Sequence, residues 1–173
     1  RKTYPYEGSA HIPYIVKWPA GISKSIPDGS SIEQPVELRD FLPTFIDIAG
    51  GSVPPDMDGR SLLKLIQGQQ EQWRPYIDME HATCYSDNYW AALTDGKIKY
   101  IWNFHNGSEQ LFDLREDPGE THNLSEDAAY QNKLSELRKM MVEHLSERGD
   151  SFVKDGKLMT LDTTLLYSPN FPK

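Results

Sequence analysis

The sequence has almost no cysteine and no long apolar run. Cys84 is the only cysteine among the 173 residues, which excludes internal disulfides and zinc sites built from several thiolates and leaves the redox compartment open. No apolar stretch approaches the roughly 20 residues of a membrane span, and the first residues lack the apolar core of a signal peptide. We therefore expect no membrane-spanning segment.

Positive charge is also scarce. The chain carries 18 Lys and Arg against 26 Asp and Glu, a net charge of -8, and its basic residues form no stripe that could follow a phosphate backbone. Nucleic acid is therefore not an expected partner, and a site for an anionic substrate would need a metal ion or local cations of its own. The five histidines form no His-x-x-x-His pair, so no metal site is expected within the chain.

Apolar residues are numerous enough for a sizeable core, at 38% of the sequence. Residues 12–16 form a short apolar run between prolines, which favours a strand buried in a parallel sheet, although this chain offers such a strand few neighbours. Apolar residues at helical spacing predict a helix over 38–49 that packs on a core through Phe45 and stops at Gly50. A second, short helix is expected between Ser61 as N-cap and Gly68.

The second half of the chain has the pattern of a small α+β subdomain. Alternating apolar residues predict antiparallel strands joined by turns at Asp95-Gly96 and Asn106-Gly107, because both dipeptides tolerate positive backbone angles. Apolar residues on one face predict a long helix. The expected strands lie within 75–82, 89–104 and 108–114, with a further strand at 157–161, and the helix covers 130–145.

Few residues outside these elements indicate chemistry by themselves. Cys84 could be a nucleophile, but its neighbours "HATCYSDN" supply no activating pattern, so an incidental thiol is the simpler interpretation. The carboxylates of "LREDPGETHNL" resemble a metal cluster, yet Asp117-Pro118-Gly119 is typical of a turn. His81 is more interesting, because it ends a predicted strand, where a side chain can point into a cleft.

The strings "KTYPYEGSAHIPYIVKWP", "LRDFLPTFIDIAG", "DGRSLLKLIQG" and "EQLFDLREDPGETHNL" follow one another within residues 2–145. Together and in this order, they resemble motifs of the sulfatase family of the alkaline-phosphatase superfamily. "KTYPYEGSAHIPYIVKWP" is similar to the stretch that runs from a substrate-binding lysine through Tyr-Glu-Gly into a core strand. "LRDFLPTFIDIAG" and "DGRSLLKLIQG" resemble the family's Asp-x-x-Pro-Thr and Asp-Gly-x-Ser-Leu elements, and "EQLFDLREDPGETHNL" its C-terminal turn. The chain is thus identified as the C-terminal portion of an arylsulfatase-type enzyme.

This resemblance implies an α/β fold in which residues 1–70 end the catalytic domain and 71–173 form a C-terminal subdomain of antiparallel sheet and packed helix. It implies hydrolysis of aryl or carbohydrate sulfate esters by the whole protein, with this fragment alone inactive. The family uses a calcium ion and a formylglycine made in a Cys/Ser-x-Pro-x-Arg motif. Neither fits this chain, since Cys84 lies outside any such motif, so both are expected in a missing N-terminal part. Periplasmic or extracellular location is the family's habit.

The resemblance also transfers a role to individual residues. Lys2, four residues before Tyr6, corresponds to the lysine whose ammonium binds sulfate oxygens, and an ammonium is a suitable donor for an oxyanion. His11 lies where relatives often carry a basic residue, and His81 begins a loop, 81–89, that could border the substrate pocket. Both are therefore candidate substrate-binding residues.

Two other functions stay open at this point. One is a phosphonate or phosphate ester hydrolase of the same superfamily, which shares the C-terminal architecture and a lysine near the anion. The other is a noncatalytic module that binds anionic glycans, which should be soluble and monomeric alone. A truncated sulfatase should instead expose an unpaired sheet edge around residues 14–18.

Overall fold

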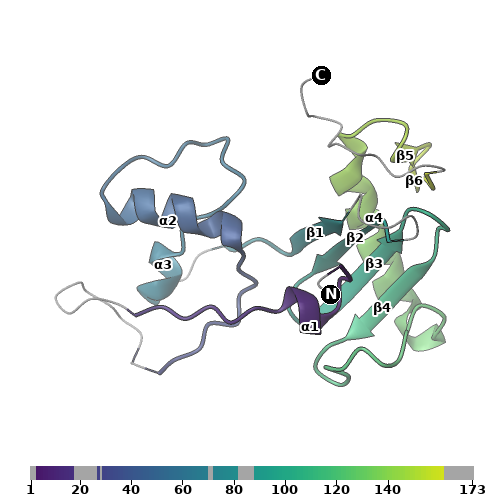
Figure 1. Cartoon of the computed structure of the whole chain (residues 1–173), viewed down its shortest axis with the longest axis horizontal. Coiled ribbons are helices and arrows are strands. Elements are labelled where there is room, and N and C mark those ends of the chain that lie inside the picture. Colours follow the sequence, from purple (N-terminus) through teal and green to yellow (C-terminus); the bar gives the residue numbers. More distant parts are fainter. Residues whose placement is uncertain (1–2, 18–26, 28, 70–71, 82–87, 162–173) are drawn as a thin grey trace. The chain divides into compact units, whose positions relative to one another are not determined.

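The structure, a computed structural model of the chain, describes residues 3–17, 27, 29–69, 72–81 and 88–161 (Figure 1). The chain forms two compact units. We call residues 1–13 and 78–173 the sheet unit and residues 14–77 the helical unit. In the described part of the chain, no helix combines the length and the apolar character needed to cross a membrane.

The sheet unit is built on a four-stranded sheet of order β1-β2-β3-β4. β2 pairs antiparallel with β3, and β3 with β4. The backbone φ of Gly96 is 84° and that of Gly107 is 70°, so both glycines take the left-handed conformation that tight turns need. The predicted strands and both turns are confirmed. The strands are β1 (Ile77–His81), β2 (Trp90–Thr94), β3 (Ile98–Asn103) and β4 (Glu109–Asp113).

One face of this sheet is covered by the long helix α4 (Gln131–Ser146), which follows the short helix η2 (Ala128–Tyr130). The helix contacts β2 and β3, and its apolar stripe is buried: Leu134, Leu137, Met141 and Leu145. Arg138 fastens it with two hydrogen bonds to Glu109, at 2.7 and 2.6 Å. The amphipathic pattern therefore predicted both the helix and its buried face correctly.

The opposite face of the sheet carries a second apolar cluster, made of Trp90, Ala92, Ile101 and Phe112. Tyr6 of the N-terminal segment packs on this cluster, and its hydroxyl donates to Gln110 at 3.2 Å. The short helix α1 (Glu7–Ala10) follows directly. Figure 1 shows α1 and α4 on opposite sides of the sheet.

The last described elements form a small hairpin of β5 (Val153–Lys154) and β6 (Lys157–Leu158). The predicted strand at 157–161 is thus present but shorter. Phe152 precedes the hairpin and is buried against Phe104, with ring centroids 5.6 Å apart.

The described part of the helical unit contains three short helices: η1 (Leu38–Asp40), α2 (Phe41–Ile48) and α3 (Leu63–Ile66). Its core is Leu62, Leu65 and Ile66, with Tyr14, Val36 and Trp73 packed against them. Gly50 (φ 74°) and Gly68 (φ 71°) follow α2 and α3, which confirms both as helix stops.

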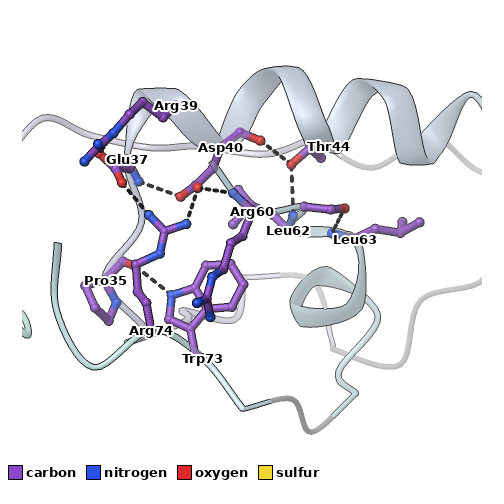
Figure 2. A network of polar contacts seen from close by, with 11 residues as sticks. Pro35, Glu37, Arg39, Asp40, Thr44, Arg60, Leu62, Leu63, Trp73 and Arg74 are labelled. Carbon is purple, nitrogen blue, oxygen red and sulfur yellow. Dashed lines mark hydrogen bonds and ion pairs between the residues drawn. The ribbon is translucent and has the colours of Figure 1, made fainter. Parts of the chain in front are cut away.

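A buried carboxylate organises this unit. Asp40 is completely buried and accepts hydrogen bonds from the backbone N–H groups of Glu37 (2.9 Å) and Arg60 (2.8 Å). Arg74 forms ion pairs with both Asp40 and Glu37 (Figure 2). Because a buried charge is tolerated only when it is paired, Asp40 binds three separate segments together.

The two motifs that resemble sulfatase elements meet at this point. The Thr44 hydroxyl donates to the Asp40 carbonyl (2.5 Å) and accepts from the backbone N–H of Leu62 (2.9 Å) (Figure 2). A Cβ at Gly59 would lie 1.9 Å from the carbonyl oxygen of Arg39, so only glycine allows this approach. The motif residues thus hold α2 against the loop before α3.

Two expectations, one for residues 12–16 and one for Phe45 in the helical unit, are wrong. Residues 12–16 form no strand, and Ile15 is 90% exposed, because a strand needs a pairing partner and the described chain provides none there. Phe45 does not pack α2 on a core but is 60% exposed. The helix instead buries Pro43 and Thr44, because Asp40 at its start must face its hydrogen-bond donors.

The predicted division of the whole fold into 1–70 and 71–173 stays a prediction. Within this chain, residues 1–13 group with the sheet, because Thr3, Tyr6 and Glu7 make their contacts there.

Candidate active-site segment

The candidate site is the segment from Thr3 to His11, which follows the predicted sulfate-binding lysine. Lys2 itself lies outside the described residues, so its role stays a prediction. The backbone carbonyl of Thr3 accepts hydrogen bonds from Asn88 Nδ2 and from Trp90 Nε1, the latter at 3.0 Å. Asn88 and Trp90 are 6% and 7% exposed, so two nearly buried side chains fix the residue next to Lys2.

A second attachment lies four residues further on. Lys99, the second residue of β3, is completely buried, and its Nζ lies 2.7 Å from Glu7 Oε1 and 2.8 Å from Glu120 Oε1. The other oxygen of Glu120 accepts the backbone N–H of Glu7 at 2.5 Å. We call Glu7, Lys99 and Glu120 the lysine cluster. It joins three segments distant in sequence: α1, β3 and the turn after β4.

The lysine cluster has two carboxylates for one ammonium. His11 Nδ1 lies 2.7 Å from Glu7 Oε2, although the His11 side chain is 75% exposed. When it is protonated, His11 therefore balances the second carboxylate. The structure thus places His11 beside Glu7, and whether it also contacts substrate stays a prediction.

His81 ends β1 and meets the same neighbours as Thr3. Its Nδ1 lies 2.9 Å from the backbone carbonyl of Asn88, and its ring stacks on Trp90 with centroids 5.9 Å apart. Because a carbonyl only accepts, Nδ1 carries the proton, and Nε2 accepts a hydrogen bond in the neutral ring and donates in the charged one. His81 and Thr3 are thus connected through Asn88 and Trp90, whereas His11 contacts Glu7 of the lysine cluster.

Sequence reasoning missed four residues of this arrangement: Asn88, Trp90, Lys99 and Glu120. Lys99 carried a signal, since it is a lone charge in the apolar strand Ile98–Asn103. A strand with both faces buried requires a partner for such a charge. Glu120 is one of two described non-glycine residues with positive φ, at 52°, but that conformation is not visible in the sequence.

The turn around Asp117 is structural, as expected. Its carboxylate accepts hydrogen bonds from the backbone N–H groups of Thr121 (2.7 Å) and His122 (2.8 Å), and these bonds lower the pKa of Asp117. Asn123 likewise accepts from the N–H of Leu111 at 2.9 Å. Within the described ranges, no group of three or more His, Cys, Asp or Glu side chains could hold a metal ion. Cys84 lies outside those ranges.

Comparisons with known proteins now identify the class. Residues 1–147 match the model of the family described as N-sulphoglucosamine sulphohydrolase, C-terminal. The chain is 35% identical over 159 residues to an arylsulfatase of Clostridium perfringens, covering 92% of this chain and 32% of that protein. The chain spans about a third of the length of the curated relatives it matches first.

Solved structures of sulfatases and of a related hydrolase are also similar to this chain. A 2-O GAG sulfatase superposes with a TM-score of 0.58 at 29% identity, over 65% of this chain and 25% of that one. A phosphonate monoester hydrolase from Silicibacter pomeroyi superposes with a TM-score of 0.57 at 24% identity, over 76% and 30%. The latter likeness shows the fold alone.

The fold is therefore that of the alkaline-phosphatase superfamily. More narrowly, this chain belongs to the sulfatase family, as its C-terminal domain, which confirms the resemblance seen in the sequence.

Proposed function

We propose that this chain is the C-terminal part of a sulfatase that hydrolyses aryl or carbohydrate sulfate esters, and that Lys2 binds the sulfate. The match over 92% of the chain to an arylsulfatase carries this proposal. The geometry supports it, because Asn88 and Trp90 hold the carbonyl of Thr3. A lysine joined to a fixed residue can keep its ammonium near an anion without a large loss of conformational entropy.

Within the reaction, this chain supplies binding and orientation. The Lys2 ammonium donates hydrogen bonds to sulfate oxygens and stabilises the negative charge that grows on the leaving-group oxygen as the ester S–O bond breaks. His81 Nε2 offers one further polar contact to the alcohol or sugar that carries the sulfate. The relative named a 2-O GAG sulfatase supports a carbohydrate substrate for this site.

The calcium ion and formylglycine of the family are proposed to belong to the remaining two thirds of the protein. The described residues contain no cluster that could hold a metal, and Cys84 is followed by Tyr-Ser-Asp-Asn rather than x-Pro-x-Arg. The metal ion therefore does not fit the described residues, and the formylglycine does not fit the sequence around Cys84. No step through either group is assigned to the residues of this chain.

An exposed apolar surface supports the proposal that the rest of the catalytic site lies in the N-terminal part of the protein. On η1 and α2, five large apolar side chains are exposed: Leu38, Phe41, Leu42, Phe45 and Ile48. Patches of this kind usually mark an interface. Because the chain spans about a third of its relatives, we propose that the N-terminal part of the same protein covers this surface and that the chain alone is inactive.

The activity is tested in the whole protein that carries this chain, by hydrolysis of p-nitrophenyl sulfate, p-nitrophenyl phosphate and a phenylphosphonate monoester. We expect the sulfate to be preferred, and Lys2→Ala to lower kcat/KM by about 10²–10³. Lys154→Ala, at an exposed lysine of the sheet unit, is the matched control and should change little. Preference for the phosphonate would favour the other branch of the superfamily, and unchanged turnover of Lys2→Ala would remove its role.

The proposal that the N-terminal part covers the apolar surface of η1 and α2 is tested with the double substitution Leu42→Glu and Phe45→Glu. In the isolated chain this pair should reduce self-association and binding of a hydrophobic dye, whereas in the whole protein it should lower the yield of folded enzyme. Ser52→Glu, at an exposed polar position of the same unit, should do neither. An isolated wild-type chain that is monomeric, binds no dye and binds sulfated glycan would instead support a free-standing binding module.

A further inference from the structure

The lysine cluster places charged groups where burial is energetically unfavourable. Lys99 is completely buried between two carboxylates, and the desolvation of buried ions offsets much of their attraction. Apolar side chains of similar volume often replace such clusters without loss of stability. The retention of three charges here therefore needs a reason other than stability, and conformational specificity is one such reason.

The segment Glu7–Ala10, which the cluster contacts, is not stable as a helix by itself. Helix α1 has only four residues, Glu7–Ala10, with no side-chain hydrogen bond at its N-cap and no buried residue. An isolated helix of this length is unstable in water. The conformation of residues 7–10 therefore depends on the contacts of Glu7 with Lys99 and Glu120.

Two attachments on one short segment restrict it strongly. The carbonyl of Thr3 is held by Asn88 and Trp90, and Glu7 is held by Lys99 and Glu120. Four residues span at most about 14 Å, so a segment fixed at both ends can neither swing from the sheet nor slide along it. Both attachments come from the sheet unit.

We propose that Lys99 is a positioning residue for catalysis: through Glu7 it fixes residues 3–11 and so aims Lys2 at the bound sulfate. This inference rests on the proposed role of Lys2. It assigns the sheet unit an active part in the reaction, because a residue 97 positions away in the sequence then determines where the substrate-binding ammonium lies.

The prediction is that loss of Lys99 impairs activity only through Lys2. In the whole protein, Lys99→Met should lower kcat/KM for p-nitrophenyl sulfate by about 10–100-fold, since misplacement of a binding group by about 1 Å costs that much. In a Lys2→Ala background the same substitution should change kcat/KM by no more than about twofold, because the group being positioned is already absent. Glu7→Gln keeps the shape of the side chain and carries the same test if Lys99→Met does not fold.

Glu109→Gln is the matched control. Glu109 joins the sheet to α4 through a bidentate ion pair with Arg138. This pair lies on the opposite face of the sheet from the lysine cluster. Glu109→Gln should lower the melting temperature yet leave kcat/KM within about twofold in both backgrounds. Hydrogen exchange adds a readout without activity: the amides of Glu7, Ala10 and His11 should lose protection in Lys99→Met and keep it in Glu109→Gln.

The outcomes separate the two proposals. Equal losses in the Lys2 and Lys2→Ala backgrounds, with Lys2→Ala itself strongly impaired, would overturn the positioning role and leave the function of Lys2 intact. Full activity of Lys99→Met would do the same. Full activity of Lys2→Ala would overturn the role of Lys2 and this inference with it.

Discussion

Replacing Gly59 by alanine should unfold the helical unit more readily, through a clash that can be placed atom by atom. The added Cβ would lie 1.9 Å from the carbonyl oxygen and 2.4 Å from the carbonyl carbon of Arg39. The first distance falls about 1.5 Å short of the 3.4 Å at which ordinary contact begins. Both obstacles are backbone atoms, so no side chain can turn away, and the loop after Gly59 must move from η1 and α2.

The size of the effect follows from the bonds that this movement breaks. The N–H of Arg60 donates to the buried carboxylate of Asp40 at 2.8 Å, and the N–H of Leu62 donates to Thr44 Oγ1 at 2.9 Å. A hydrogen bond to a charged group contributes about 1.5–3 kcal/mol and a neutral one about 0.5–1.5 kcal/mol. We therefore expect Gly59→Ala to lower the free energy of unfolding by about 2–4 kcal/mol.

Urea unfolding followed by tryptophan fluorescence measures this change. Trp73 reports on the helical unit, since its indole N–H donates to Pro35 at 2.8 Å and its ring stacks under Arg74 at 5.0 Å. Gly8→Ala is the control, because a Cβ at Gly8 meets nothing within 4 Å and alanine favours its helical conformation. A Gly59→Ala variant within about 1 kcal/mol of the wild type would refute the reasoning, since one hydrogen bond to the Asp40 carboxylate is worth more.

Three further predictions concern buried charges and hydroxyls. Asp40→Asn keeps the shape of the side chain but removes the charge that three donors share, so the free energy of unfolding in urea should fall by about 2–4 kcal/mol; an unchanged midpoint would contradict this. Burial by itself would raise the pKa of Glu109. Hydrogen bonds from Arg138 and Tyr100, together with the positive charge of Arg138, outweigh burial and lower this pKa below 4.5. The stability from this pair is present above pH 4.5 and lost as the pH falls through the lower folded pKa. The melting temperatures of wild type and Arg138→Gln should therefore converge in acid, and a gap that stays constant with pH would disprove the linkage. Burial, helped by a nearby carboxylate, raises the pKa of Tyr89 from 10.0 to about 12. The unfolded chain releases this proton first, so thermal stability should fall between pH 10 and 12, and by less in Tyr89→Phe.

The sheet unit was predicted well because its signals are local. The turns at Asp95-Gly96 and Asn106-Gly107 need positive φ, which only a few residue types supply, and the strands between them follow with little freedom. The apolar stripe of α4 is buried against strands of the same unit, so the periodicity alone indicated the buried face of this helix.

The helical unit was predicted less well because periodicity identifies an apolar face but not what covers it. Phe45 lies on the apolar face of α2 and is exposed, whereas Asp40, a charged residue, is the buried one. The cost of an unpaired buried carboxylate exceeds the gain from burying one aromatic ring. The donors that decide this competition come from Arg60 and Arg74, which lie 20 and 34 residues away.

The sequence by itself determined the turns and the long helix, because each depends on residue types at fixed spacing, and its resemblance to the sulfatases indicated the family and the candidate lysine. Only the tertiary structure decided that Asn88, Trp90 and Lys99 converge on the segment after Lys2. Contacts between residues some 90 positions apart leave no periodic trace, and an ion pair such as Lys99 with Glu7 becomes defined only when the sheet excludes water from both partners.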